Sequence, residues 1–191
     1  MERAGLKRVQ QSVAPLFERT RRFRVYQSWV IPGLLQSAGY TRAVLSTVAQ
    51  LRDVPDDIDD AVAVRMDRQR ILHSGDHRFA MLVEEWVLRT VIGDSDTMAG
   101  ALGHLISVAS LPSVSLGVIP LGTPRGAGWP VESFTMYDDA QVNVELVSAH
   151  LTVTQPGEIA EYARTFAELS AIAVYGVQAR SLITTAIDAL G

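Results

Sequence analysis

Apolar and polar positions alternate along the chain with two different periods, which separate helices from short strands. Apolar residues recur three and four positions apart in the segments predicted to be helical, which are residues 31–51, 58–72, 95–111, 156–173 and 182–190. Strict alternation predicts strands over residues 78–83, 114–119, 132–137 and 141–147, with a further strand at 150–155. Helices therefore dominate both ends of the chain.

The predicted strands lie close together in the sequence, which favours antiparallel pairing. Asp138 and Asp139 separate two of them and predict a hairpin. We therefore expect an α+β fold with helices at both ends of the chain packed on a small, mostly antiparallel sheet. A chain of 191 residues can bury one core without disulfides. The expected organisation is a basic helical arm at residues 1–24, followed by a single α+β effector or interaction domain at residues 25–191.

Charge is distributed unevenly in an otherwise acidic chain. With 17 Lys and Arg against 21 Asp and Glu, the formal net charge is −4, which argues against a surface built throughout to neutralise phosphates. Seven basic residues precede position 25, in a segment where Pro15 is expected to break a helix over residues 6–23. This arm is either a solvated helix face or a contact for nucleic acid or an acidic partner.

Cysteine is absent, which excludes disulfides, thiolate zinc sites and cysteine nucleophiles. The charged N-terminus leads into no apolar segment typical of a secretory signal, and the longest apolar runs fall short of the ~20 residues that cross a membrane. A cytoplasmic protein without membrane contact is expected.

Few residues form a pattern of known chemistry. The glycine-rich loop at residues 122–130, with Arg125 and Trp129, matches no nucleotide fingerprint and is interpreted as a lid over a pocket or as a plain connection. The four histidines do not converge, and no serine lies in a nucleophile elbow. Neither a metal nor a cofactor is predicted.

Two polar residues, Arg65 and Gln69, interrupt the apolar stripe of the helix at 58–72. A guanidinium turned toward a core needs a compensating partner, so we expect Arg65 to be largely buried against a carboxylate, Glu85 first and Glu145 second. Such a pair is either structural or the charged anchor of a ligand pocket. If Arg65→Ala strands a buried carboxylate, the expected loss of stability is about 3–5 kcal/mol.

Several runs together resemble the C-terminal domain of actinobacterial helix-turn-helix regulators of the XRE group, over roughly residues 25–187. The matching runs are Ile31-Pro32-Gly33-Leu34-Leu35-Gln36, Arg65-x-x-Arg68-Gln69, Glu84-Glu85-x-x-Leu88-Arg89, Ser133-Phe134 and Val142-x-Val144-Glu145. That domain has no assigned biochemistry. This chain departs from it in having Asn143 where a tyrosine is usual, and in having only some 25 residues before the match, too few for the DNA-reading bundle.

The resemblance implies an antitoxin-like regulatory binding domain that senses a small-molecule effector or binds a small protein partner, without sequence-specific binding to nucleic acid. A homodimer is compatible with that role. The alternative hypothesis is a small cofactor-free enzyme of secondary metabolism, of isomerase or cyclase type, with an enclosed apolar pocket. Whether the chain catalyses any reaction stays open at this point. The candidate ligand-binding residues are Trp29, Arg65, Arg68, Gln69, Glu85, Trp86, Trp129, Phe134 and Glu145.

Overall fold

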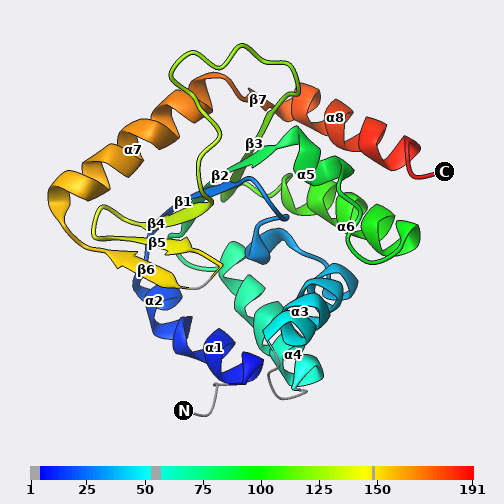
Figure 1. Cartoon of the computed structure of the whole chain (residues 1–191), viewed down its shortest axis with the longest axis horizontal. Helices are drawn as coiled ribbons and strands as arrows, with labels where there is room; N and C mark the ends of the chain where they lie inside the picture. The colour runs from blue at the N-terminus through cyan, green and yellow to red at the C-terminus, as the bar shows by residue number, and fades with distance from the viewer. Residues whose placement is uncertain (1–4, 53–56, 148) are drawn as a thin grey trace.

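A seven-stranded mixed sheet forms the centre of the protein in the computed structural model, which describes residues 5–52, 57–147 and 149–191 (Figure 1). The strand order is β6-β5-β4-β1-β2-β3-β7. The strands are β1 (Arg22–Gln27), β2 (Arg78–Glu84), β3 (Val114–Ile119), β4 (Phe134–Tyr137), β5 (Gln141–Glu145), β6 (His150–Val153) and β7 (Val174–Tyr175).

The middle of the sheet is parallel. Strand β2 pairs in parallel with β1 on one side and β3 on the other. Helices α3 (Ala38–Arg52) and α4 (Ile58–Arg68) connect β1 to β2, and helices α5 (Glu85–Arg89) and α6 (Ser95–Val108) connect β2 to β3. Parallel neighbours need such long crossovers, usually helical ones.

The outer strands pair in the antiparallel sense. The predicted hairpin is confirmed, because β4 and β5 pair around Asp138 and Asp139, and Asp138 adopts a left-handed conformation with φ 52°. The expectation of a small, mostly antiparallel sheet is wrong. The sheet is large, and β3 pairs in parallel with β2 and in the antiparallel sense with β7.

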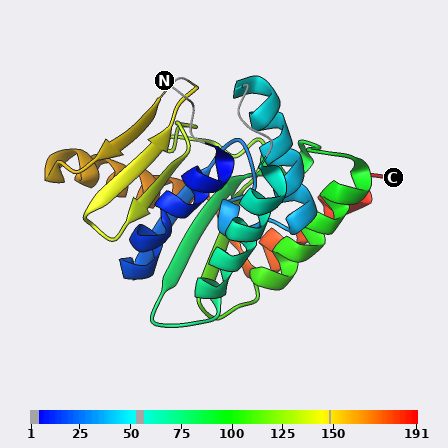
Figure 2. The ribbon, with the colours of Figure 1, turned by 90° about the horizontal axis from the view of Figure 1, so that it is seen from below.

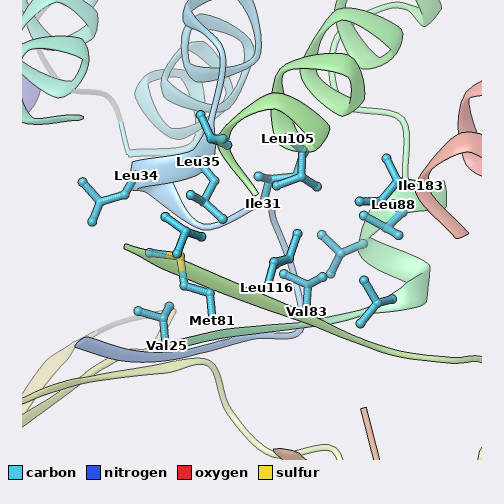
Figure 3. Packing of buried hydrophobic residues seen from close by; sticks show 14 of the residues in the cluster. Val25, Ile31, Leu34, Leu35, Met81, Val83, Leu88, Leu105, Leu116 and Ile183 are labelled. Atoms are coloured by element: carbon cyan, nitrogen blue, oxygen red, sulfur yellow. The ribbon is translucent and has the colours of Figure 1, made fainter. Parts of the chain in front are cut away.

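Helices cover the two faces of the sheet unequally. Side chains from α3, α6 and α8 (Gly176–Asp188) share one apolar core with the strands, whereas α7 (Pro156–Ala171) packs on the opposite face with Tyr26, Leu82 and Phe134. Figure 2 shows α3, α4 and α6 together on one side of the strands. Figure 3 shows how Val25, Met81, Val83 and Leu116, at alternating strand positions, point toward side chains of the covering helices.

The N-terminal segment is part of the fold. Helices α1 (Leu6–Ser12) and α2 (Ala14–Arg19) meet at Val13, with Pro15 in the first turn of the second, so the predicted break is confirmed. The Asp57 carboxylate accepts the backbone N–H groups of Leu6 and Lys7 at 3.0 and 2.9 Å and fixes α1 beside α4. Strand β1 begins at Arg22 and therefore crosses the arm boundary expected at residue 24.

Two short 3-10 helices, η1 (Gly33–Leu35) and η2 (Gln69–Leu72), flank the helix pair α3 and α4. Among the helices of the described ranges, none is long and apolar enough to cross a membrane.

Candidate functional site

The carboxyl ends of β1, β2 and β3 lie together at one end of the sheet, where ligand sites of parallel sheets commonly lie. Glu84 is the last residue of β2, and Ser28 directly follows β1. Residues 122–130, the glycine-rich loop, lie in the long connection between β3 and β4 at the top of Figure 1.

A buried carboxylate holds this loop in place. Glu84 is fully buried, and its two oxygens accept hydrogen bonds from Arg125 Nη1 at 2.8 Å and Nη2 at 2.6 Å. The Tyr26 hydroxyl donates a third hydrogen bond to Glu84 Oε1 at 2.7 Å. A buried charge is tolerated only when it is paired and hydrogen-bonded, and a bidentate arginine meets both needs. The Glu84–Arg125 ion pair therefore ties the loop to the end of β2.

Further contacts connect the loop to its surroundings. The Arg125 guanidinium lies 5.8 Å from the centroid of the Trp86 ring, and Trp86 Nε1 donates to the carbonyl oxygen of Ser28 at 2.6 Å. At Gly128 a Cβ atom would lie 2.7 Å from Ile172 Cδ1, so a larger residue there would displace this side chain at the end of α7. The loop therefore lies against Trp86 through Arg125 and close to Ile172 through Gly128.

Alkaline pH is expected to unfold the protein through its buried tyrosines. Burial raises the pKa of Tyr137 to about 12, and burial together with the hydrogen bond to Glu84 raises the pKa of Tyr26. Unfolded tyrosine has a pKa of about 10, so the folded chain keeps these protons where the unfolded chain has lost them. Their contribution to stability is present below pH ~10 and is lost as the pH rises toward 12.

Parallel measurement of phenolate absorbance and circular dichroism tests this expectation. The phenolate signal of Tyr26 and Tyr137 should appear together with loss of structure, and Tyr137→Phe should make stability less dependent on alkaline pH. Complete tyrosine ionisation near pH ~10 in a protein that stays folded would contradict it.

Two tryptophans on segments at the carboxyl ends of the parallel strands leave large aromatic surfaces in solvent. Trp29 is 61 % exposed and Trp129 is 70 % exposed. Their segments adjoin, because the Ser28 hydroxyl bonds to the carbonyl oxygen of Val131 at 3.3 Å and the Ser28 N–H donates to Ser133 Oγ at 3.0 Å. We call this region, defined by Trp29, Trp129 and the loop at 122–130, the tryptophan surface.

Five of the predicted site residues lie at this end of the sheet, in different environments. Trp29 and Trp129 are exposed, and Trp86 is half-buried beneath Arg125. Phe134 is buried in the core, with its ring 5.0 Å from that of Tyr162. Glu85 is buried and accepts hydrogen bonds from Arg89 Nη2 at 2.6 Å and the Leu121 N–H at 2.8 Å.

The other four predicted residues are Arg65 and Arg68 on α4, Gln69 at the start of η2, and Glu145, the last residue of β5, next to Val144, which pairs with Phe134. Arg65 donates from Nε to Gln10 Oε1 at 3.2 Å and from Nη1 to Gln36 Oε1 at 2.9 Å. The choice of Glu85 as its partner is wrong, because Glu85 is taken up by Arg89 and Leu121. Burial lowers the pKa of Arg65 to about 10, Arg68 acts in the same direction, and the nearby Glu145 opposes the shift.

Gln36 is the centre of this second cluster. The Gln69 side chain donates to the backbone carbonyl of Gln36 at 2.7 Å, while Arg68 donates to Gln10 and lies 4.9 Å over the Phe17 ring. Arg65 donates these hydrogen bonds to amide oxygens, and each of those oxygens also accepts from another donor. These bonds therefore do not support the loss of about 3–5 kcal/mol that was expected for Arg65→Ala if it strands a carboxylate. The sequence reasoning did not select Gln10 or Gln36 as functional candidates. The signal for Gln36 was its position at the end of the Pro-Gly-Leu-Leu-Gln run.

These observations define a domain with a mixed sheet whose parallel strands end beneath an anchored loop and exposed aromatic residues. The chain belongs to the family described as Domain of unknown function (DUF5753), which matches residues 10–185. No curated protein shows significant similarity to it.

Proposed function

We propose that the chain is a regulatory binding domain that recognises a protein partner through the tryptophan surface. The observation that carries this proposal is the pair of solvent-exposed indoles, Trp29 and Trp129, on adjoining segments. Tryptophan is enriched among the residues that dominate interface energetics, and exposing such a ring to water without a partner is unfavourable.

The anchored loop supports a preorganised interface. Arg125, from the same loop as Trp129, is fixed by two hydrogen bonds to the fully buried Glu84. A surface whose backbone is already held loses less conformational entropy when it binds. A partner that contacts Trp129 therefore meets a loop that is already anchored at Arg125.

The regulatory part of the proposal draws on the resemblance to the C-terminal domain of antitoxin-like XRE regulators of actinobacteria. Membership of a family without assigned function is compatible with that role. The alternative enzyme hypothesis needs an enclosed apolar pocket, and two hollows on the described surface, both bordered by arginines, are open instead. We propose the binding role because the exposed indoles support it directly.

Site-specific crosslinking followed by affinity measurement tests the proposal. A photo-crosslinking amino acid at position 129 should capture one protein in the native host that the same amino acid at position 51 does not capture. With that protein purified, Trp29→Ala and Trp129→Ala should each weaken binding at least about tenfold.

Leu51→Ala provides the matched control, because Leu51 is 80 % exposed and lies on α3, outside the residues that define the tryptophan surface. It should leave the affinity within about twofold. Equal capture from positions 129 and 51, or tryptophan variants that bind as tightly as the unchanged protein, would rule the proposal out.

A further inference from the structure

A concentration of arginines surrounds two open hollows at the amino ends of β1 and β2. The hollows have volumes of about 350 and about 780 Å³, and Arg22 and Arg78 line both. Together they are bordered by five arginines, Arg19, Arg21, Arg22, Arg24 and Arg78, and by three aspartates, Asp76, Asp138 and Asp139. The local formal charge of +2, five minus three, contrasts with −4 for the whole chain.

The strand register sets like charges against each other. Arg22 and Arg78 are direct partners in the parallel pairing of β1 and β2. Two cations in directly opposed positions destabilise a sheet, so this pair costs stability that another residue type would avoid. A local conflict of this kind is characteristic of a functional site.

The aspartates compensate this charge only in part. Asp139 forms ion pairs with Arg22 and Arg24. The Asp138 carboxylate accepts the backbone N–H of Arg22 at 2.8 Å and so caps the start of β1. Arg78 Nη1 donates to the carbonyl oxygen of His77 at 3.0 Å, and no ion pair of Arg78 is present among the described residues.

Small side chains leave room in the smaller hollow beside the arginines. Across the sheet, Arg24 is in register with Ala80, and Ala80 with Ser115, on the face that α7 covers farther along the strands. Ser115 is exposed, so this part of the face stays open. A volume of about 350 Å³ lies within the range of small-molecule sites, about 300–1,000 Å³.

We propose that this hollow binds the diphosphate or polyphosphate group of a small molecule, with Arg22 and Arg78 as its principal ligands. Neighbouring strands lie ~4.8 Å apart, so two guanidinium groups on opposed residues can hold oxygens of the same phosphate group. The planar fork of arginine suits phosphate, and a multiply charged anion offsets the repulsion between the two side chains. This proposal concerns the opposite end of the strands from the tryptophan surface and does not rest on the proposed function.

Calorimetric titration of the full chain with inorganic pyrophosphate at about 50 mM salt tests the site. Saturable binding of one equivalent is expected, and Arg22→Gln and Arg78→Gln should each weaken it at least about tenfold. Arg70→Gln is the matched control, because Arg70 is an exposed arginine paired with Asp67 outside the hollows, and it should change affinity by less than about twofold.

Two further measurements separate a phosphate site from a folding defect. Asp139→Asn should tighten pyrophosphate binding about threefold or more, because it removes the internal competitor for Arg22 and Arg24. Arg78→Gln should leave the melting temperature unchanged or higher, because it relieves the opposed charges.

Three outcomes would overturn the proposal. They are the absence of saturable pyrophosphate binding, an equal loss of affinity in Arg70→Gln, and a weakening of binding in Asp139→Asn. If a DNA duplex of arbitrary sequence binds and pyrophosphate does not, the arginines serve a nucleic-acid backbone, and the small-molecule site is likewise excluded.

Discussion

Replacing Arg125 with alanine is expected to lower the free energy of unfolding by about 3–5 kcal/mol. The substitution removes both guanidinium hydrogen bonds to Glu84. Of the three side-chain hydrogen bonds to this fully buried carboxylate, only the one from the Tyr26 hydroxyl is left. A buried charge without its counter-ion costs more than the pair itself contributes. Urea denaturation monitored by circular dichroism measures the difference.

Two control variants make this expectation specific. The double variant Glu84→Gln with Arg125→Met should recover much of the loss, because it removes the charge along with its partner and roughly keeps the volume. Arg70→Ala breaks an exposed pair, because the side chains of Arg70 and Asp67 are 78 % and 61 % exposed, so a loss of about 1 kcal/mol or less is expected. If Arg125→Ala unfolds within about 0.5 kcal/mol of the unchanged protein, Glu84 does not depend on Arg125.

Gln36→Ala is expected to destabilise the protein by about 2–4 kcal/mol. The Gln36 side chain is buried and donates to the carbonyl oxygen of Ile31 at 2.7 Å. It also accepts from the Thr41 hydroxyl at 3.1 Å and from Arg65 at 2.9 Å. Alanine at this position leaves all three groups without this partner, and each unsatisfied buried group costs about 1–3 kcal/mol.

The matched control is Gln50→Ala, a change of the same chemistry at an exposed position of α3, which should stay within about 0.5 kcal/mol of the unchanged protein. Denaturant unfolding of both variants is the measurement. Equal stability of Gln36→Ala and Gln50→Ala would contradict the expectation that the hydrogen bonds of Gln36 stabilise the fold.

The sequence predicted most helices and strands but not the order of the sheet. Period-3.6 stripes located α4 and α6, and alternation located β2 to β5. The main error concerns β1, of which residues 22–24 were assigned to the basic arm and residues 25–27 to no strand, although polar and apolar residues alternate from Arg22 to Val25. The other parallel partner of β2 is β3, which was predicted as a strand, but its pairing with β2 was not, because nearness in the sequence favoured antiparallel pairing with the strands that follow.

The sequence singles out individual polar and aromatic residues but not how the fold arranges them. The polar interruption of a stripe correctly marked Arg65 as needing partners, yet nothing in local spacing distinguishes Gln10 and Gln36 from a carboxylate as the group it meets. The loop at 122–130 was singled out with Arg125 in it. Its partner Glu84 lies 41 residues earlier, and only the fold brings the two together.

The two edges of the sheet differ in what they offer to a strand from another molecule. At one edge β7 has only two residues, too short a template for continued backbone pairing. At the other, β6 has four residues and carries Leu151, which is 45 % exposed, close to the 86 % exposed Val147. If the chain is ever extended by strand addition, the added strand will therefore join at β6, far along the sheet from the parallel strands that carry the buried ion pair.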